Sequence, residues 1–365
     1  MPKRKGFLYE WMCDKERIRA AIAFGAAKKK QRHDVKTVLA DVDGYTDKVY
    51  TLLNTQSYIP STPKRRNIYD PSSRKQRTIE YVPFYPDGII QTLMVMALEP
   101  TILRGMNYWC CASVPKRGGK HAMRRCKRVI HHDKKGSRYV CKMDVHHFYH
   151  SIDRRKLIWM LAHKVKDKKF LKLTWDIIQT CEHGLAIGFF ICQWLANFYL
   201  ESLDRYITTL DGVKHTVRYM DDIVLFGSNK KKLHRARKVI AEYLQNRLRL
   251  RMKGNWQVFP LKSRALDFVG YRFYRDHTTM RRRNFLRFTR QCRRVRKRIL
   301  QHRRIPFKTA SGLLSRIGQL KHCNAVAVRE KYVDPIGVKL LKEVVRNESK
   351  RRQRAQQCVL AGGAA

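Results

Sequence analysis

The feature of this sequence that most constrains its fold is a pair of adjacent carboxylates between two stretches of β-strand composition. Residues 215 to 226 are rich in β-branched and aromatic side chains on both sides of Asp221 and Asp222, which predicts a hairpin with the acidic pair at its turn. Neighbouring carboxylates repel each other, and divalent cations, which prefer oxygen ligands, remove that repulsion. A solvated Asp-Asp turn is the alternative, because Asp is common in turns.

A site for two metal ions needs a further carboxylate from elsewhere in the chain, close enough to bridge ions about 3.5 to 4 Å apart. Residues 138 to 145 predict a short strand with Asp144 near its end, and Phe148 and Tyr149 come soon after it. Together, Tyr-Met-Asp-Asp and the upstream Asp-Val-x-x-Phe-Tyr resemble the palm of reverse transcriptases. The resemblance extends from about residue 35 to residue 335 and so covers most of the chain.

The resemblance implies an RNA-directed DNA polymerase with the right-hand α/β architecture of fingers, ferredoxin-like palm and helical thumb. Asp144, Asp221 and the backbone carbonyl of Val145 would then hold two Mg²⁺, for which Mn²⁺ can substitute, and Asp222 would support the geometry. The implied partners are an RNA template, a DNA or RNA primer and dNTPs, with a small basic accessory protein as a further candidate.

The nucleotide pocket is predicted from a second hairpin. Residues 67 to 79 lie in a proline-rich region and predict a hairpin with basic residues near its turn. By resemblance this hairpin belongs to the fingers, and Lys75 and Arg77 lie where the family binds the triphosphate. A solvated basic loop is the alternative. Tyr149 is the candidate steric gate against a ribose 2′-hydroxyl. The other implied nucleotide-binding residues are Val145, Phe148, Ile187, Gly188 and Gln193.

One motif bears on the subgroup. Before a helix predicted from about residue 189 to 208, Ile187-Gly188 is followed after three residues by Cys192-Gln193. Most reverse transcriptases carry Gln-Gly-x-x-x-Ser-Pro there, whereas enzymes of diversity-generating retroelements carry an aliphatic residue before the glycine and Ser-Gln at the end. The chain therefore resembles a bacterial or phage enzyme of the diversity-generating retroelement or group II intron-like lineage, although Cys192 departs from that pattern. A phage-defence or retron-like reverse transcriptase is the alternative. In place of a hydrogen-bonding Gln, Ile187 predicts error-prone synthesis, because apolar contacts discriminate weakly.

The charge of the chain independently favours a polyanionic partner. Its 79 Lys and Arg against 29 Asp and Glu give a net charge of +50, so a compact state is strongly self-repelling unless nucleic acid neutralises it. No apolar run approaches the ~18 residues that could span a membrane. Ten scattered cysteines without a Cys-x-x-Cys pair favour reduced thiols in a cytoplasmic protein. A non-catalytic basic RNA-binding protein on a polymerase scaffold and an RNA-templated RNA polymerase stay open as other functions.

Three segments predict contacts to nucleic acid. Residues 113 to 120 resemble the family's glycine-containing loop, where glycines let backbone amides approach phosphates. Residues 267 to 271 resemble its primer-grip turn. Residues 281 to 304 carry twelve Lys or Arg, and their apolar positions at helical spacing predict a thumb helix along a duplex, with a solvated basic helix as the alternative. The candidate contact residues are Arg117, Lys120, Gly270, Tyr271, Arg293, Arg294 and Lys297.

The predicted order of elements is a split βαβ, ferredoxin-like plan. It comprises a strand at 138 to 145, a helix at 153 to 166, the hairpin at 215 to 226, a helix at 229 to 247 and a strand at 248 to 252. The expected domains are a basic N-terminal arm at 1–34, fingers and palm at 35–284, a helical thumb at 285–345 and a flexible tail at 346–365.

Overall fold

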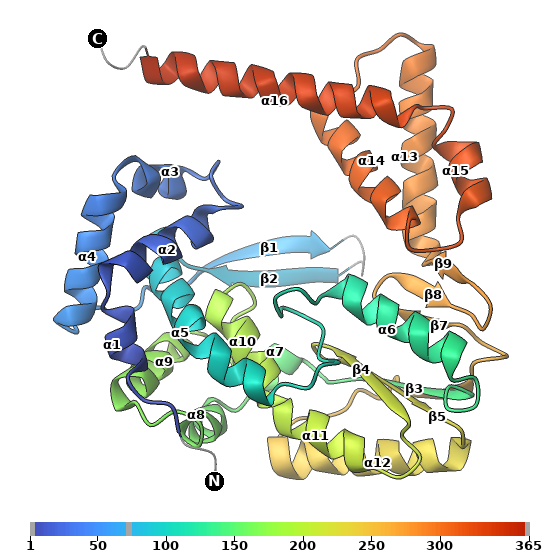
Figure 1. Ribbon diagram of the computed structural model, residues 1–365, viewed down its shortest axis with the longest axis horizontal. Coiled ribbons are helices and arrows are strands. Elements are labelled where there is room, and N and C mark those ends of the chain that lie inside the picture. The colour runs from blue at the N-terminus through green and yellow to red at the C-terminus, as the bar shows by residue number, and fades with distance from the viewer. Residues whose placement is uncertain (1–3, 71–74, 362–365) are drawn as a thin grey trace. The chain divides into compact units, whose positions relative to one another are not determined.

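The structure is a computed structural model that describes residues 4–70 and 75–361, with the side chains of Asp70, Lys75 and residues 352–361 outside that description. The chain forms two compact units, Met1–Pro260 and Leu261–Ala365 (Figure 1). Within the described residues, no helix combines the length and the apolar composition needed to cross a membrane.

The first unit is built on a four-stranded antiparallel sheet. Its strands are β3 (Tyr139–Asp144), β4 (His215–Tyr219), β5 (Asp222–Gly227) and β6 (Gln257–Pro260), in the order β4-β5-β3-β6. This strand order confirms the predicted ferredoxin-like plan. Four consecutive residues of β5, from Ile223 to Phe226, are fully buried, which is why this strand is apolar throughout.

The prediction of a strand at residues 248 to 252 is wrong. Helix α12 (Lys230–Leu248) continues through the first of these residues, and Arg249 ends it in a left-handed conformation with φ 53°. Met252 forms only an isolated bridge with Val145. The sheet's fourth strand is β6, which pairs with β3 five residues further along the chain.

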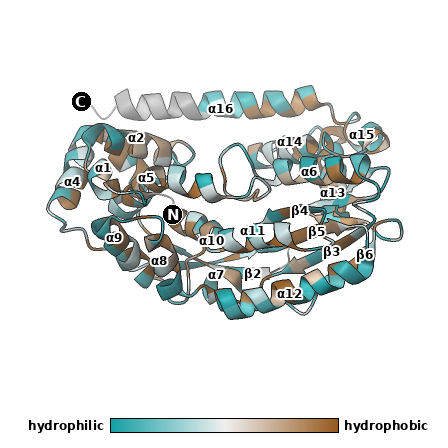
Figure 2. Cartoon of the chain, turned by 60° about the horizontal axis from the view of Figure 1, so that its bottom comes forward, coloured by the Kyte–Doolittle hydropathy of each residue, from teal (hydrophilic) through white to brown (hydrophobic). Residues whose placement is uncertain are grey.

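Helix α12 covers the sheet because its apolar side chains recur on one face. Leu233, Ala236, Ile240, Leu244 and Leu248 are all buried, at the three- and four-residue spacing of a core-facing helix. The side chain of Asn229 accepts a hydrogen bond from the Lys232 amide and so caps the first turn. The hydrophilic residues of α12 are prominent in Figure 2.

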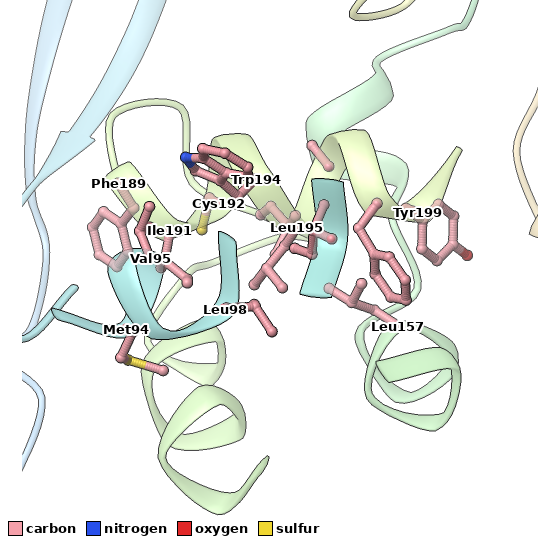
Figure 3. Packing of buried hydrophobic residues seen from close by; sticks show 14 of the residues in the cluster. Met94, Val95, Leu98, Leu157, Phe189, Ile191, Cys192, Trp194, Leu195 and Tyr199 are labelled. Carbon is pink, nitrogen blue, oxygen red and sulfur yellow. The ribbon is translucent and has the colours of Figure 1, made fainter. Parts of the chain in front are cut away.

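The rest of the first unit is mostly helical and surrounds α5 (Ile89–Gly105), which is apolar on nearly every side. Met94, Val95 and Leu98 of α5 lie with residues of α10 (Phe190–Tyr199) in one buried cluster (Figure 3). Burying one such side chain contributes about 1.5–3 kcal/mol relative to leaving it exposed. The other elements are α3 (His33–Ala40), α4 (Val42–Asn54), β1 (Lys64–Asp70), β2 (Lys75–Tyr81), η1 (Phe84–Gly88), α6 (Gly119–His132), α7 (Phe148–Ser151), α8 (Arg154–Ala162), α9 (Lys168–Gln179) and α11 (Glu201–Thr209).

The N-terminal residues, which were expected as a basic arm, are largely helical. They form α1 (Leu8–Met12) and α2 (Lys15–Ala26), and Asp14 caps α2 by accepting a hydrogen bond from the Arg17 amide at 2.9 Å. Ile18 and Ile22, four residues apart, are buried in the core. Lys15, Arg17 and Arg19, which lie before and between these two residues, mask this apolar face in the sequence. The segment is part of the first compact unit.

Over its described residues, Leu261 to Ala361, the second unit contains a small antiparallel sheet and four helices. The strands are β7 (Leu266–Phe268), β8 (Tyr271–Phe273) and β9 (Thr278–Met280), and the helices are α13 (Arg282–Leu300), α14 (Phe307–Leu320), α15 (Val326–Tyr332) and α16 (Val338–Ala361). Phe288, Cys292 and Val295 of α13 are buried in this unit's own core, with Leu313 and Leu341. Helix α16 includes residues 346–361 of the predicted tail.

Candidate active site

The acidic pair lies where the sequence predicts it, at the connection between β4 and β5. Tyr219 pairs with Asp222 across the hairpin, and Asp222 also pairs with Asp144 on the neighbouring strand β3. Met220 has a left-handed backbone with φ 55°, which costs a non-glycine residue roughly 1–3 kcal/mol and persists only where its surroundings hold it. The Val145 amide donates to the Asp221 carbonyl at 3.3 Å and ties the turn to the end of β3.

Arg218, a buried residue of β4, holds this turn in place and is not among the predicted site residues. Its side chain is only 2% exposed and binds both carboxylate oxygens of Asp204 at 2.7 Å. It also donates to the Met220 carbonyl at 3.0 Å and to the Asn197 side chain at 3.1 Å. A buried guanidinium is stable only when it is paired in this way. Its one signal in the sequence is a charged residue inside a stretch of β-strand composition.

The carboxylates perturb one another electrostatically. Burial raises the pKa of Asp221 to about 6, and the charges of Asp144 and Asp222 add to that increase, while Lys253 opposes it. Lys253 forms an ion pair with the Asp144 side chain, and its amide donates to the Asp144 carbonyl at 2.8 Å. Lys142 lies 3.9 Å from a carboxylate oxygen of Asp222. Neither lysine has a signal in the periodicity of the sequence, because these contacts arise only in the folded chain.

The donor set suits hard divalent cations. Carboxylate and carbonyl oxygens are the ligands that Mg²⁺ prefers. Burial, and then the charges of Asp144 and Asp222, raise the pKa of Asp221, and a cation would stabilise its ionised form. Across the part of the chain that the structure describes, no three His, Cys, Asp or Glu side chains converge on one coordination point. Asp144 and Asp222 instead face Lys253 and Lys142, whose ammonium groups supply positive charge at the same oxygens.

Tyr149 lies beside this cluster. Its hydroxyl donates to the Met220 sulfur at 3.8 Å, and burial raises its pKa, with Cys192 and Asp221 adding to the effect. Phe148, by contrast, is 3% exposed and packs in the core. The candidate gate Tyr149 therefore lies at the acidic turn, whereas Phe148 is buried in the core.

Ile187 and Gly188 meet the fingers hairpin. The Ile187 carbonyl accepts a hydrogen bond from the Glu80 amide of β2 at 3.2 Å. Gly188 has φ 138°, and an added Cβ would clash with the Glu80 carbonyl, so only glycine fits there. Ile187 also lines a cavity of about 390 Å³ together with Thr78 of β2. Gln193 is half-buried in the first turn of α10.

The two predicted triphosphate-binding cations both lie on β2. Arg77 is exposed and pairs with Ile68 of β1. By strand alternation it projects on the same face as Ile79, whose side chain lies against Gly188. The side chain of Lys75 is outside the described residues.

Arg117 and Lys120 differ in their surroundings. The Arg117 guanidinium donates to the carbonyls of Asn107 and Cys110 at 2.9 and 3.1 Å, and it lies 5.1 Å from the centre of the Tyr108 ring. It therefore holds its own loop together. Lys120 is exposed in the first turn of α6.

The remaining candidates lie in the second unit. Gly270, with φ 89°, turns the chain between β7 and β8, and the Tyr271 hydroxyl donates to the Gln319 carbonyl at 3.2 Å. Arg293, Arg294 and Lys297 are exposed on α13, on faces other than the one that buries Phe288, Cys292 and Val295.

The sequence profile of a family described as reverse transcriptase (RNA-dependent DNA polymerase) matches residues 72–273, more than half of the chain. The chain belongs to the reverse transcriptase family. The matched region contains Asp144, Tyr149, Ile187 and the Asp221-Asp222 turn, and the predicted resemblance is confirmed. The sheet β4-β5-β3-β6 is accordingly the palm of this reverse transcriptase, and its mixed α/β fold class is confirmed as well.

Two bacterial relatives extend this comparison. Protein YkfC of Escherichia coli (strain K12) is 22% identical over 256 residues, which are 58% of this chain and 67% of that protein. Group II intron-encoded protein LtrA of Lactococcus lactis subsp. cremoris is 25% identical over 268 residues, which are 66% of this chain and 43% of LtrA. The second relative agrees with the predicted group II intron-like lineage. The reverse transcriptase described here spans less than half of LtrA's length.

Solved structures of telomerases are also similar. Apo telomerase from Candida tropicalis has a TM-score of 0.48 at 12% identity, covering 85% of this chain and 64% of that one. Telomerase from Candida albicans bound to a fragment of telomeric RNA has a TM-score of 0.44 at 10% identity, covering 60% and 46%.

Proposed function

We propose that this reverse transcriptase is an active RNA-directed DNA polymerase that makes cDNA on an RNA template. The observation that carries the proposal is the strand register that puts Asp144 opposite Asp222, with Asp221 at the adjoining turn, inside the palm. A non-catalytic RNA-binding protein has no use for three clustered carboxylates, one of which has its pKa raised by burial and by the charges of the other two.

In this proposal Asp144, Asp221 and the Val145 carbonyl hold two Mg²⁺, and Asp222 supports the geometry. When bound, the ions activate the primer 3′-hydroxyl and stabilise the leaving group, so that catalysis is mainly positioning and electrostatics. Arg218 keeps the Met220 carbonyl, and with it the turn, in place.

The nucleotide is positioned by side chains around the turn. Arg77 and Lys75 bind the triphosphate, for which a guanidinium offers paired donors and an ammonium a point charge. Tyr149 blocks a ribose 2′-hydroxyl beside Asp221, which favours dNTPs and opposes an RNA-polymerase activity. Ile187 offers the nucleotide only shape and apolar contact, with Gly188 keeping the backbone close to β2.

Nucleic acid is bound through the chain's positive charge. Exposed Arg293, Arg294 and Lys297 contact phosphates of the template–primer duplex, and Gly270 with Tyr271 forms the primer grip. Lys120 contacts the template backbone, while Arg117 supports the loop before it.

For the biological setting we propose a diversity-generating retroelement. The support is the motif Ile187-Gly188 with Gln193, in which an aliphatic residue replaces the hydrogen-bonding Gln. A template repeat and a variable target gene beside the coding sequence would agree with this setting, and genes of a retron or a phage-defence system would contradict it.

The polymerase proposal is tested by Asp144→Asn and Asp221→Asn, which remove an anionic ligand with little change in volume. Both should abolish primer extension and leave affinity for an RNA–DNA duplex nearly unchanged. Asp211→Asn is the matched control, because Asp211 is an exposed carboxylate paired with Lys232. Normal extension by either site variant would overturn the assignment.

A further inference from the structure

A second cavity, of about 510 Å³, lies on the first unit and shares no lining residue with the proposed active site. Four segments that are far apart in sequence form it: the N-terminal residues, the end of α5, the turn after α8, and α11. Six of its lining side chains are basic, namely Arg4, Lys5, Arg104, Lys164, Lys166 and Arg205. Among the described residues, no Asp or Glu lines it.

The wall that carries the N-terminal residues is built into the fold. The Lys5 amide donates to the Lys164 carbonyl at 2.7 Å, and the Lys166 amide donates to the Lys5 carbonyl at 2.8 Å. This two-way pairing forms a parallel bridge between Lys5 and Val165. Arg4 also reaches the Ala162 carbonyl at 3.4 Å. These hydrogen bonds therefore hold Arg4 and Lys5 at the cavity.

The cavity keeps a large positive excess. Two of the lining cations are paired with Glu201, which is buried. It binds the Lys164 ammonium with both oxygens at 2.7 Å and also pairs with Arg205. The six basic lining residues and Glu201 together carry a net charge of +5, with His163 left out of the count. Cations that converge on a concave site raise its potential and attract anions more strongly than the same charges spread over a flat surface.

An aromatic ring completes the site. Phe7 lines the cavity and is 69% exposed, although its neighbours Leu8 and Tyr9 are buried. The Lys166 ammonium lies 5.7 Å from the centre of the Phe7 ring. An exposed ring next to clustered cations offers one surface for an apolar or aromatic group and another for phosphates.

We infer that this cavity binds a nucleotide with adjacent phosphates, with the base against Phe7 and the phosphates among the cations. Its volume lies within the ~300–1,000 Å³ of small-ligand sites. Arg4 and Arg104 supply planar paired donors, and Lys166 a point charge, for phosphate oxygens. The nucleotide has two sources, a free nucleoside triphosphate or the 5′-terminal nucleotide of an RNA. The site does not depend on polymerase activity.

The test measures ATP binding by equilibrium dialysis in the full-length Asp221→Asn protein, with EDTA and roughly physiological salt to screen diffuse attraction. These conditions remove metal-dependent nucleotide binding at the polymerase site, so the two proposals fail independently. The pocket variant combines Arg4→Gln, Arg104→Gln and Lys166→Gln. It spares Lys164 and Arg205, whose loss would leave Glu201 buried without a partner.

A matched control variant removes the same charge elsewhere. It combines Lys28→Gln, Lys30→Gln and Lys36→Gln, three exposed lysines outside the cavity. The pocket variant should raise the Kd for ATP by roughly tenfold or more, since losing one charge-assisted phosphate contact costs about that factor. The control should change it by less than about twofold, which is the scale of screened surface charges. Equal losses in both variants would overturn the site.

Two further measurements identify the ligand. Phe7→Ala should weaken ATP binding without changing the affinity for inorganic triphosphate, and equal effects on both would contradict contact with the base. A short RNA is then compared with a 5′-triphosphate or a 5′-hydroxyl. If the pocket substitutions weaken binding of the triphosphorylated RNA only, the site is assigned to RNA ends. If they weaken ATP binding to the same extent, the site is assigned to free nucleotides. If the pocket variant is unfolded by circular dichroism, Arg104→Gln alone replaces it.

Discussion

Asp221→Asn should stabilise the metal-free protein at alkaline pH, which is unusual for a change at a catalytic residue. Burial, and then the charges of Asp144 and Asp222, raise the pKa of Asp221 from 3.8 to about 6. The difference of about 2 units corresponds to ~3 kcal/mol at 1.36 kcal/mol per unit, and partial screening by solvent brings the expected effect to about 1 to 3 kcal/mol.

The sign follows from proton linkage. The folded state binds this proton more tightly than the unfolded state, so ionisation of Asp221 disfavours the folded state. The penalty is absent below pH 3.8, grows as the pH rises toward 6 and is complete above it. Asn carries no charge at any pH, and the variant should therefore match the wild type at pH about 4 and exceed its stability at pH about 8.

Urea denaturation in EDTA at these two pH values measures the difference, with Asp211→Asn as the control. Asp211 is exposed and its hydrogen bond to Lys232 lowers its pKa, so its replacement should not stabilise the protein. If Asp221→Asn were no more stable than the wild type at the higher pH, the carboxylates would not form the mutually repelling cluster that the account requires.

Three further predictions concern the nucleotide, the duplex and fidelity. Tyr149→Ala should raise ribonucleotide incorporation relative to deoxyribonucleotide incorporation, because the ring beside Asp221 no longer blocks a 2′-hydroxyl; an unmoved ratio in competition assays would place the gate elsewhere. Replacing Arg293, Arg294 and Lys297 with Gln should reduce the slope of log affinity against log salt by about 0.9 per lost contact on B-DNA; an unchanged slope in anisotropy titrations would mean that these side chains do not contact phosphates. Ile187→Gln should lower the error rate of cDNA, because apolar contacts discriminate by only ~1 to 3 kcal/mol while hydrogen-bonding sites discriminate more strongly. Equal and low error rates in both proteins would remove the support for a diversifying retroelement.

The palm was predictable because its signals are local. Short stretches of β-strand composition and an acidic turn mark β3, β4 and β5, and the periodicity of α12 marks the helix that covers them. The strand predicted at residues 248 to 252 failed because its alternating apolar residues include Leu248, the last residue of α12. The true edge strand, β6, is only four residues long and ends in proline.

The residues that support the site could not be predicted from the sequence. Arg218 binds Asp204, 14 positions away, and Lys253 binds Asp144, 109 positions away. The Glu80 amide donates to the carbonyl of Ile187, which is also remote in the sequence. A motif shows which residues carry charge, and it does not show which carbonyl or carboxylate each of them meets. The roles of the candidate site residues, and the division into arm, fingers and palm, thumb and tail, stay predictions.

Primer extension by the wild-type protein on a defined RNA template tests the central claim most directly. The reaction is run with Mg²⁺ and either dNTPs or rNTPs as the only nucleotides. The account predicts full-length DNA with dNTPs, little product with rNTPs and none when EDTA removes the metal. Absence of extension with dNTPs, under conditions where the protein binds the primer–template, would contradict it, and so would a preference for rNTPs.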